Sequence, residues 1–137
     1  MATINKEIEI KCSRDFAWDA IRDVGAIHKR LVPGFVTDCV LEDGVRTVTF
    51  RNGLTVRELI VTVDDATCRH AWGTHDKPFT HYSASAQVFS SGRDACRVVW
   101  IADFLPNEIA DTMAETIDEG LNAMKQALES TIEGKRK

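Results

Sequence analysis

The chain has 137 residues, 44% of them hydrophobic and 28% charged, a balance that is ordinary for one globular domain with its own core. Its formal net charge of -4 argues against a nucleic-acid partner, because phosphate binding needs a basic face, and the only basic run is Gly134-Lys135-Arg136-Lys137. No apolar stretch approaches the roughly 20 residues of a membrane-spanning helix, so we expect no membrane insertion. We predict a single domain over residues 1–133, followed by a basic, solvated tail over residues 134–137.

The first part of the chain predicts a strand and two short helices. Ile4, Ile8 and Ile10 alternate with polar residues, which is typical of a strand with one buried face. Ser13 is a suitable N-cap for a short helix after this strand. A second helical turn or two can form from residue 26 to residue 31, where Pro33-Gly34 ends it.

From Phe35 onward the sequence has short apolar stretches separated by turn residues, which is typical of antiparallel hairpins. Asp43-Gly44 and Asn52-Gly53 are dipeptides that supply the positive φ angles of two-residue turns. Together with the first strand they predict about seven strands, the later ones over residues 36–41, 45–50, 54–63, 67–73, 80–89 and 96–104.

The last segment, Asn107 to Ile132, predicts one long amphipathic helix. Its apolar residues recur at helical spacing: Ile109, Met113, Ile117, Leu121, Met124, Leu128 and Ile132. At 1.5 Å per residue this helix would be roughly 40 Å long, more than one strand pair can cover. We therefore expect the preceding strands to form a curved sheet against it.

The order of these elements resembles the START-like superfamily, the SRPBCC-type group of polyketide cyclases, dehydratases and lipid-transport proteins. The resemblance covers nearly the whole chain, and it implies an α+β helix-grip fold. In that fold a curved seven-stranded antiparallel sheet wraps round a long C-terminal helix, two short helices follow the first strand, and a cavity separates sheet from helix. The motifs that carry it are Phe16-Ala17-Trp18, Asp43-Gly44-Val45-Arg46-Thr47-Val48, Asn52-Gly53, Val56-Arg57-Glu58-Leu59, Asp64-Asp65, Tyr82, Val99-Trp100 and Phe104-Leu105-Pro106.

Small residues indicate where such a cavity could lie. The mainly apolar face of residues 80–89 has alanine at Ala84 and Ala86, in the middle of the strand. Gly120 interrupts the long helix, where glycine costs about 1 kcal/mol relative to alanine. Either a ligand or the close approach of a strand or aromatic ring would explain this glycine.

Glu58 is the sharpest single position. It shares strand parity with Val56 and Ile60, so an inward face would bury a carboxylate among apolar side chains. Arg46 is the nearest candidate partner, and the alternatives are a ligand anchor, an internal ion pair or an exposed side chain. Strand parity alone does not choose the inward face of this strand. The START-like superfamily also includes the plant abscisic-acid receptors, which have a pocket glutamate at the matching place, so the resemblance implies that Glu58 faces the pocket.

By the same resemblance, Trp72 and Tyr82 line the pocket and residues 73–79 form a loop at its rim; plain core packing is the alternative for both side chains. Candidate catalytic residues are Glu58, Tyr82 and Arg46. The residues predicted to contact a ligand are Arg46, Val48, Phe50, Val56, Glu58, Ile60, Trp72, Tyr82, Ala84, Met113, Thr116, Ile117 and Gly120.

Other chemistry has little support in the sequence. His70, His75, His81 and Asp76 do not repeat a metal-ligand spacing, so we predict no metal and no cofactor. No nucleophile elbow or phosphate loop is present. The four cysteines form no Cys-x-x-Cys pair and the N-terminus is too polar for a signal peptide, which indicates a reduced, cytoplasmic protein.

Three classes of function therefore remain. The first is a monomer or homodimer that binds a small apolar molecule, such as a lipid, polyketide or aromatic compound. The second is an enzyme of the cyclase, aromatase or dehydratase type that moves protons in the same cavity. The third is a protein-interaction module with a collapsed cavity.

Overall fold

The computed structural model describes residues 1–136 and has the predicted helix-grip architecture. The chain begins with β1 (Ala2–Ile10), α1 (Arg14–Ile21), α2 (Ile27–Arg30), β2 (Val36–Glu42), β3 (Val45–Phe50) and β4 (Thr55–Asp64). It continues with β5 (Arg69–Thr74), β6 (His81–Gly92), β7 (Ala95–Leu105), a 3-10 turn (Asn107–Ile109) and α3 (Ala110–Arg136).

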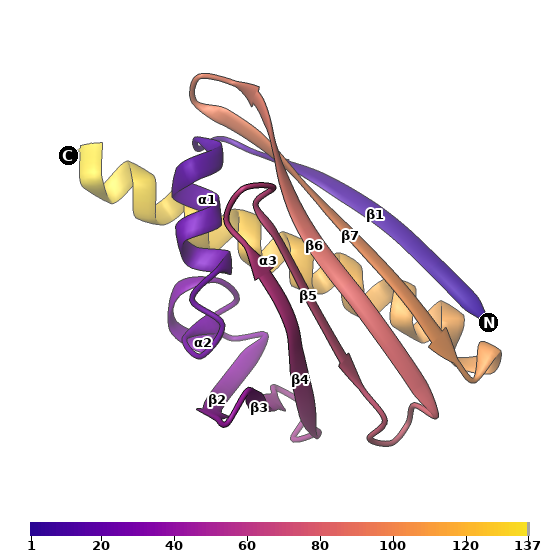
Figure 1. The fold of residues 1–137 in the computed structure, drawn as a ribbon. Coiled ribbons are helices and arrows are strands. Elements are labelled where there is room, and N and C mark those ends of the chain that lie inside the picture. Colours follow the sequence, from indigo (N-terminus) through magenta and orange to yellow (C-terminus); the bar gives the residue numbers. More distant parts are fainter. Residues whose placement is uncertain (137) are drawn as a thin grey trace.

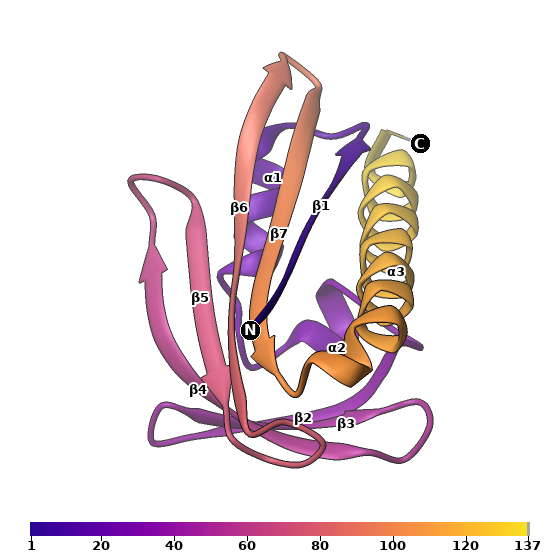
Figure 2. The ribbon, with the colours of Figure 1, turned by 90° about the vertical axis from the view of Figure 1, so that its right-hand side faces the viewer.

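The seven strands form one antiparallel sheet in the order β1-β7-β6-β5-β4-β3-β2. Figure 1 shows α3 running across the sheet behind the strands. In Figure 2, β2 and β3 turn away from β6 and β7, so the sheet curves around the side on which α2 and α3 lie. This curvature is what allows one sheet to cover a helix of 27 residues.

Local signals explain where several elements begin and turn. The Ser13 side chain accepts a hydrogen bond of 3.1 Å from the backbone N–H of Phe16, and so caps α1 as predicted. Asp43 and Gly44 have φ angles of 52° and 77°, which is the backbone conformation of the tight turn between β2 and β3.

The predicted start of β5 at Thr67 is too early. The Asp64 carboxylate accepts hydrogen bonds from the backbone of Ala66 and the hydroxyl of Thr67, and Cys68 has a φ of 53°. These residues form a turn, because an aspartate side chain can bond to the backbone two residues ahead and hold it out of the sheet. The strand consequently begins at Arg69.

One face of α3 is buried against the sheet, and its buried residues include Ile117, Leu121, Met124 and Leu128. Polar contacts fix the helix alongside β1. Lys6 Nζ lies 2.9 Å from Asp118 Oδ2, and Lys125 donates to the backbone oxygen of Glu9 at 3.0 Å. The helix is thus held both by its apolar face against the sheet and by polar contacts with the edge strand β1.

The basic C-terminal residues were expected to form a solvated tail from residue 134. Gly134 and Lys135 are exposed, and they belong to α3, which continues through Arg136. The Nζ atom of Lys135 lies 5.4 Å from the ring centroid of Phe16. At this distance the electron-rich face of the ring attracts the positive charge of the ammonium group. Lys137 lies outside the described residues.

No helix within residues 1–136 is both long enough and apolar enough to cross a membrane.

Candidate functional site

A cavity of ≈ 270 Å³ lies between the concave face of the sheet, the segment from α1 to β2, and α3. Its walls are mainly apolar. Polar side chains come both from β3, β4 and β5 and from the β3–β4 turn and α3; they include Arg46, Glu58, His70, Arg51, Asn52, Thr112, Thr116 and Glu119. The predicted residues that line it are Arg46, Val48, Phe50, Val56, Glu58, Trp72, Tyr82, Met113, Thr116 and Ile117. Their contact with a ligand remains a prediction.

Two predicted residues on the sheet lie outside the cavity wall. Ile60 is half-buried opposite Trp72, next to an irregularity in the pairing of β4 with β5. Ala84 is buried in register between Trp72 and Ala102. Strand parity assigns a side chain to a face but gives no depth along the strand, so a ligand contact at either residue remains a prediction.

Gly120 is also absent from the cavity wall, and the structure gives a packing reason for it. A Cβ atom added there would lie 2.9 Å from Cζ3 of Trp100 and 3.3 Å from Cε2 of Phe35. Both rings line the cavity. The absence of a side chain at Gly120 thus allows two aromatic rings to approach the helix backbone. Of the two explanations that the sequence left open, a ligand or the close approach of a strand or aromatic ring, the structure supports the second.

This packing predicts a difference between two glycines of the same helix. Gly134→Ala meets no atom within 4 Å and should stabilise the protein by up to about 1 kcal/mol through helix propensity. Gly120→Ala should be at least about 1 kcal/mol less favourable than Gly134→Ala, because the Trp100 ring must shift. Urea unfolding of both variants measures the difference, and equal gains would contradict the packing role of Gly120.

Arg46 and Glu58 form a buried ion pair in the cavity wall. The two residues are cross-strand partners on β3 and β4, and Arg46 Nε donates to Glu58 Oε1 at 2.8 Å. Arg46 Nη1 also donates to the backbone oxygen of Val24 at 3.3 Å. Their exposed fractions of 4% and 8% show that the Glu58 face of β4 points inward.

Burial changes the acidity of the groups around this pair. It raises the pKa of Glu58, because the ionised carboxylate loses its hydration, and the positive charge of Arg46 opposes that rise. It also raises the pKa of Tyr82, and the negative charge of Glu58 adds to the effect. The guanidinium of Arg46 is therefore the group that offsets the cost of burying the negative charge of Glu58.

Three aromatic rings continue the site across the sheet. His70 stacks on Trp72 with ring centroids 4.8 Å apart, and Trp72 meets Trp100 edge to face at 5.6 Å. Arg46 lies over the Trp72 ring, with its guanidinium carbon 5.4 Å from the ring centroid. The ion pair and the three rings therefore form one continuous part of the cavity wall.

The sequence did not identify His70 or Trp100 as cavity residues. Each could have been found from strand parity, because His70 stands two residues before Trp72, and Trp100 shares its face with Ala102 and Phe104. Phe35 and Phe79 also line the cavity but come from connections, where no periodicity assigns a direction.

The loop between β5 and β6 lies at the rim, where Pro78 and Phe79 line the cavity. Asp76 in this loop accepts from the Arg57 side chain on β4 at 2.9 Å and 3.1 Å, and from its backbone N–H at 2.8 Å. Phe79 packs on Tyr82 with ring centroids 4.6 Å apart. These contacts hold the loop in its position over the sheet.

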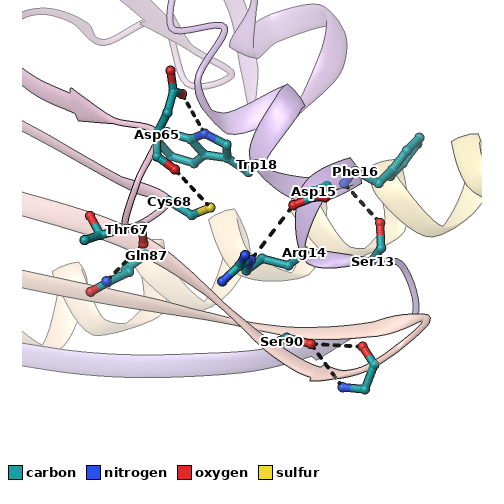
Figure 3. Close-up of polar contacts among 11 residues, drawn as sticks. Ser13, Arg14, Asp15, Phe16, Trp18, Asp65, Thr67, Cys68, Gln87 and Ser90 are labelled. Carbon is teal, nitrogen blue, oxygen red and sulfur yellow. Dashed lines mark hydrogen bonds and ion pairs between the residues drawn. The ribbon is translucent and has the colours of Figure 1, made fainter.

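Trp18 lies away from the cavity wall, although it is buried. Its indole Nε1 donates to Asp65 Oδ1 at 2.8 Å, which joins α1 to the turn after β4 (Figure 3).

In the part of the chain that the structure describes, no three His, Cys, Asp or Glu side chains are grouped so that they could hold a metal ion.

The chain belongs to the family described as polyketide cyclase / dehydrase and lipid transport, whose sequence pattern matches residues 1–129. A comparison with curated proteins finds no match. The chain is similar in structure to an uncharacterized protein from Bacillus thuringiensis, with a TM-score of 0.83, 21% identity, and coverage of 93% of this chain and 98% of the other.

Two similar structures have descriptive names. One is norcoclaurine synthase from Thalictrum flavum in complex with dopamine and hydroxybenzaldehyde, with a TM-score of 0.73, 23% identity, and coverage of 96% of this chain and 86% of that one. The other is the di-domain ARO/CYC protein BexL of the BE-7585A biosynthetic pathway, with a TM-score of 0.82 and 14% identity; 94% of this chain matches 47% of it. At these identities the likeness establishes the fold alone.

Proposed function

We propose that this protein binds a small, mainly apolar molecule with one or two aromatic rings in the cavity between the sheet and α3. The observation that carries the proposal is a mainly apolar cavity whose wall contains three buried polar side chains, namely Arg46, Glu58 and Tyr82. A volume of ≈ 270 Å³ is just below the range of about 300–1,000 Å³ usual for ligand sites. That size favours a compact ring system over a long-chain lipid.

The comparisons support this proposal at a coarser level. The family description names polyketide cyclases and lipid transport, both of which handle largely apolar molecules. The similar norcoclaurine synthase was crystallised with dopamine and hydroxybenzaldehyde, which are single-ring aromatic compounds. A ligand of comparable size in this chain would agree with the cavity volume.

An acid-base enzyme acting in the same cavity is the second candidate. The observation that favours it is Glu58, a buried carboxyl whose pKa is raised and which lies beside a guanidinium. A carboxylate of raised pKa is a stronger base and could remove a proton next to a ligand carbonyl. Turnover, in addition to binding, would distinguish this enzyme from a binding protein.

Tryptophan fluorescence tests binding directly. Titration with tetralin, which has two fused rings and does not absorb at the wavelength that excites indole selectively, should change the emission of the wild-type protein. Trp72→Phe and Trp100→Phe should each remove part of this change, because both rings line the cavity. Trp18→Phe is the matched control, since its indole is bonded to Asp65 outside the cavity wall, and it should leave the change intact.

Loss of the signal in Trp18→Phe alone would place the ligand elsewhere. No change in emission, together with no heat of binding in calorimetry, would contradict the proposed function for ligands of this class.

A further inference from the structure

A surface groove adjoins the cavity. This groove, of ≈ 620 Å³, lies between α3 and the segment that runs from α2 to the start of β2. Phe35, Arg51 and Glu119 line both the cavity and the groove. The two hollows therefore meet at these three side chains, and a molecule that extends from one into the other passes beside them.

The boundary between the cavity and the groove is held by contacts among three separate segments. The backbone N–H of Arg51, in the turn between β3 and β4, donates to the backbone oxygen of Phe35 at 3.1 Å. The Phe35 ring packs against α3, where its Cε2 atom lies 3.3 Å from the position of a Cβ added to Gly120. Arg51 Nη2 lies 3.4 Å from Glu119 Oε2, so one ion pair joins the turn to the helix.

This ion pair can open at little cost. The Arg51 and Glu119 side chains are 69% and 57% exposed. Exposed pairs of this kind contribute little to stability, because water and salt screen both charges. Arg51 can consequently exchange Glu119 for another anion without disturbing the fold.

The groove has more cationic than anionic side chains. Lys29, Arg30 and Arg51 line it, against a single carboxylate, that of Glu119. Arg30 is already paired with two aspartates that lie outside the groove wall, whereas Lys29 forms no ion pair among the residues that the structure describes. The wall also contains four neutral side chains that can form hydrogen bonds, Asn122, Gln126, Ser130 and Thr131. In a protein with a net charge of -4, this groove thus offers an anion two cations, Lys29 and Arg51.

We propose that the ligand is an aromatic compound with a short side chain that ends in a carboxylate or another oxyanion. The ring lies in the cavity, the side chain passes Phe35, and the anionic group binds Arg51 and Lys29 in the groove in place of Glu119. A guanidinium suits this role because it can donate to both oxygens of a carboxylate. The inference rests on the proposed function, and it adds a second subsite and the charge that this subsite selects.

Two ligands with the same ring and chain test this selection: 4-(1-naphthyl)butanoate and its uncharged amide, 4-(1-naphthyl)butanamide. Calorimetry should show that wild-type protein binds the butanoate about tenfold more tightly than the amide. In Arg51→Gln this ratio of affinities should fall to about two or less, because the guanidinium is lost.

Glu119→Gln should have the opposite effect and raise the ratio about threefold or more, because it removes the carboxylate that competes for Arg51. Asp118→Asn is the matched control. It removes the same charge from the neighbouring position of α3, but Asp118 is paired with Lys6 of β1 and lines neither hollow. Its ratio should stay within about twofold of wild type.

A salt titration of wild-type protein requires no variant. Raising the NaCl concentration from about 50 mM to about 500 mM should weaken the butanoate several-fold and change the amide little, because salt screens a charged contact at the surface.

The outcomes separate the groove from the cavity. If neither compound binds, the proposed function fails for this class of ligand, and the groove subsite fails with it. If the amide binds as tightly as the butanoate, or if Glu119→Gln and Asp118→Asn raise the ratio equally, binding in the cavity stands and the anion subsite at Arg51 is refuted.

Discussion

Arg46→Leu is expected to destabilise the protein by about 3–5 kcal/mol, because it leaves the carboxylate of Glu58 buried without its partner. Both residues are buried, and the bond of 2.8 Å joins their side chains directly. The double variant Arg46→Leu, Glu58→Leu should recover most of this loss, since two apolar side chains replace two charges and leave only the lost packing and the unpaired Val24 oxygen.

Urea unfolding of the two single variants and the double variant measures the coupling between these residues. Arg57→Leu is the matched control on β4. Arg57 and Asp76 form an ion pair of similar length, 2.9 Å, in which the Arg57 side chain is exposed to solvent, so the loss should be no more than about 1 kcal/mol. Additive losses from the two buried positions would mean that Arg46 and Glu58 do not depend on each other.

Glu58→Gln divides the functional alternatives further. It keeps the shape of the side chain and removes its charge, so Arg46 loses its buried counter-charge. The free energy of unfolding should fall by about 3 kcal/mol or more. If Glu58 is only a structural partner of Arg46, ligand binding by the folded protein should be unchanged. If Glu58 is also a ligand anchor or a catalytic base, binding or turnover by the folded protein should fall in addition to this loss of stability. Thermal melting and ligand titration on the same sample compare these two outcomes.

Much of the fold follows from local patterns in the sequence. Three features depend only on residues that are near one another in the sequence: the alternation of apolar and polar residues in β1, the Asp43-Gly44 turn, and the helical spacing of apolar residues along α3. The inward face of β4 is different, because both of its faces are rather apolar and parity could not choose between them. The cross-strand bond between Arg46 and Glu58 decides it, and that contact depends on register across two strands.

The parts of the site that were missed depend on three-dimensional depth. Gly120 was predicted to contact a ligand, but Trp100 and Phe35 fill the space beside it. These two residues are separated by more than sixty positions in the chain and approach the helix only because the sheet curves. No periodicity along the sequence contains that curvature, so the contact of these two rings with Gly120 could not be predicted, although strand parity could have placed Trp100 on the inward face.

The stability of the fold should fall as the pH is lowered below 7, and His70 should account for a large part of the loss. Burial lowers the pKa of its ring from 6.5 to about 3 in the folded protein. The unfolded chain therefore takes up a proton first as the pH falls, and each proton bound by the unfolded state favours unfolding. The contribution of His70 is complete above pH 6.5 and is lost progressively between pH 6.5 and about 3.

The comparison that isolates this effect is wild type against His70→Phe, which keeps a ring against Trp72 but cannot titrate. Between pH 7 and pH 5 wild type should lose about 2 kcal/mol more than the variant, because one proton of linkage is worth about 1.4 kcal/mol per pH unit. His75→Asn, in the exposed rim loop, is the control and should retain the wild-type slope. Parallel slopes for wild type and His70→Phe would show that His70 is protonated in the folded protein as readily as in the unfolded chain, and that its ring is not enclosed beside the cavity.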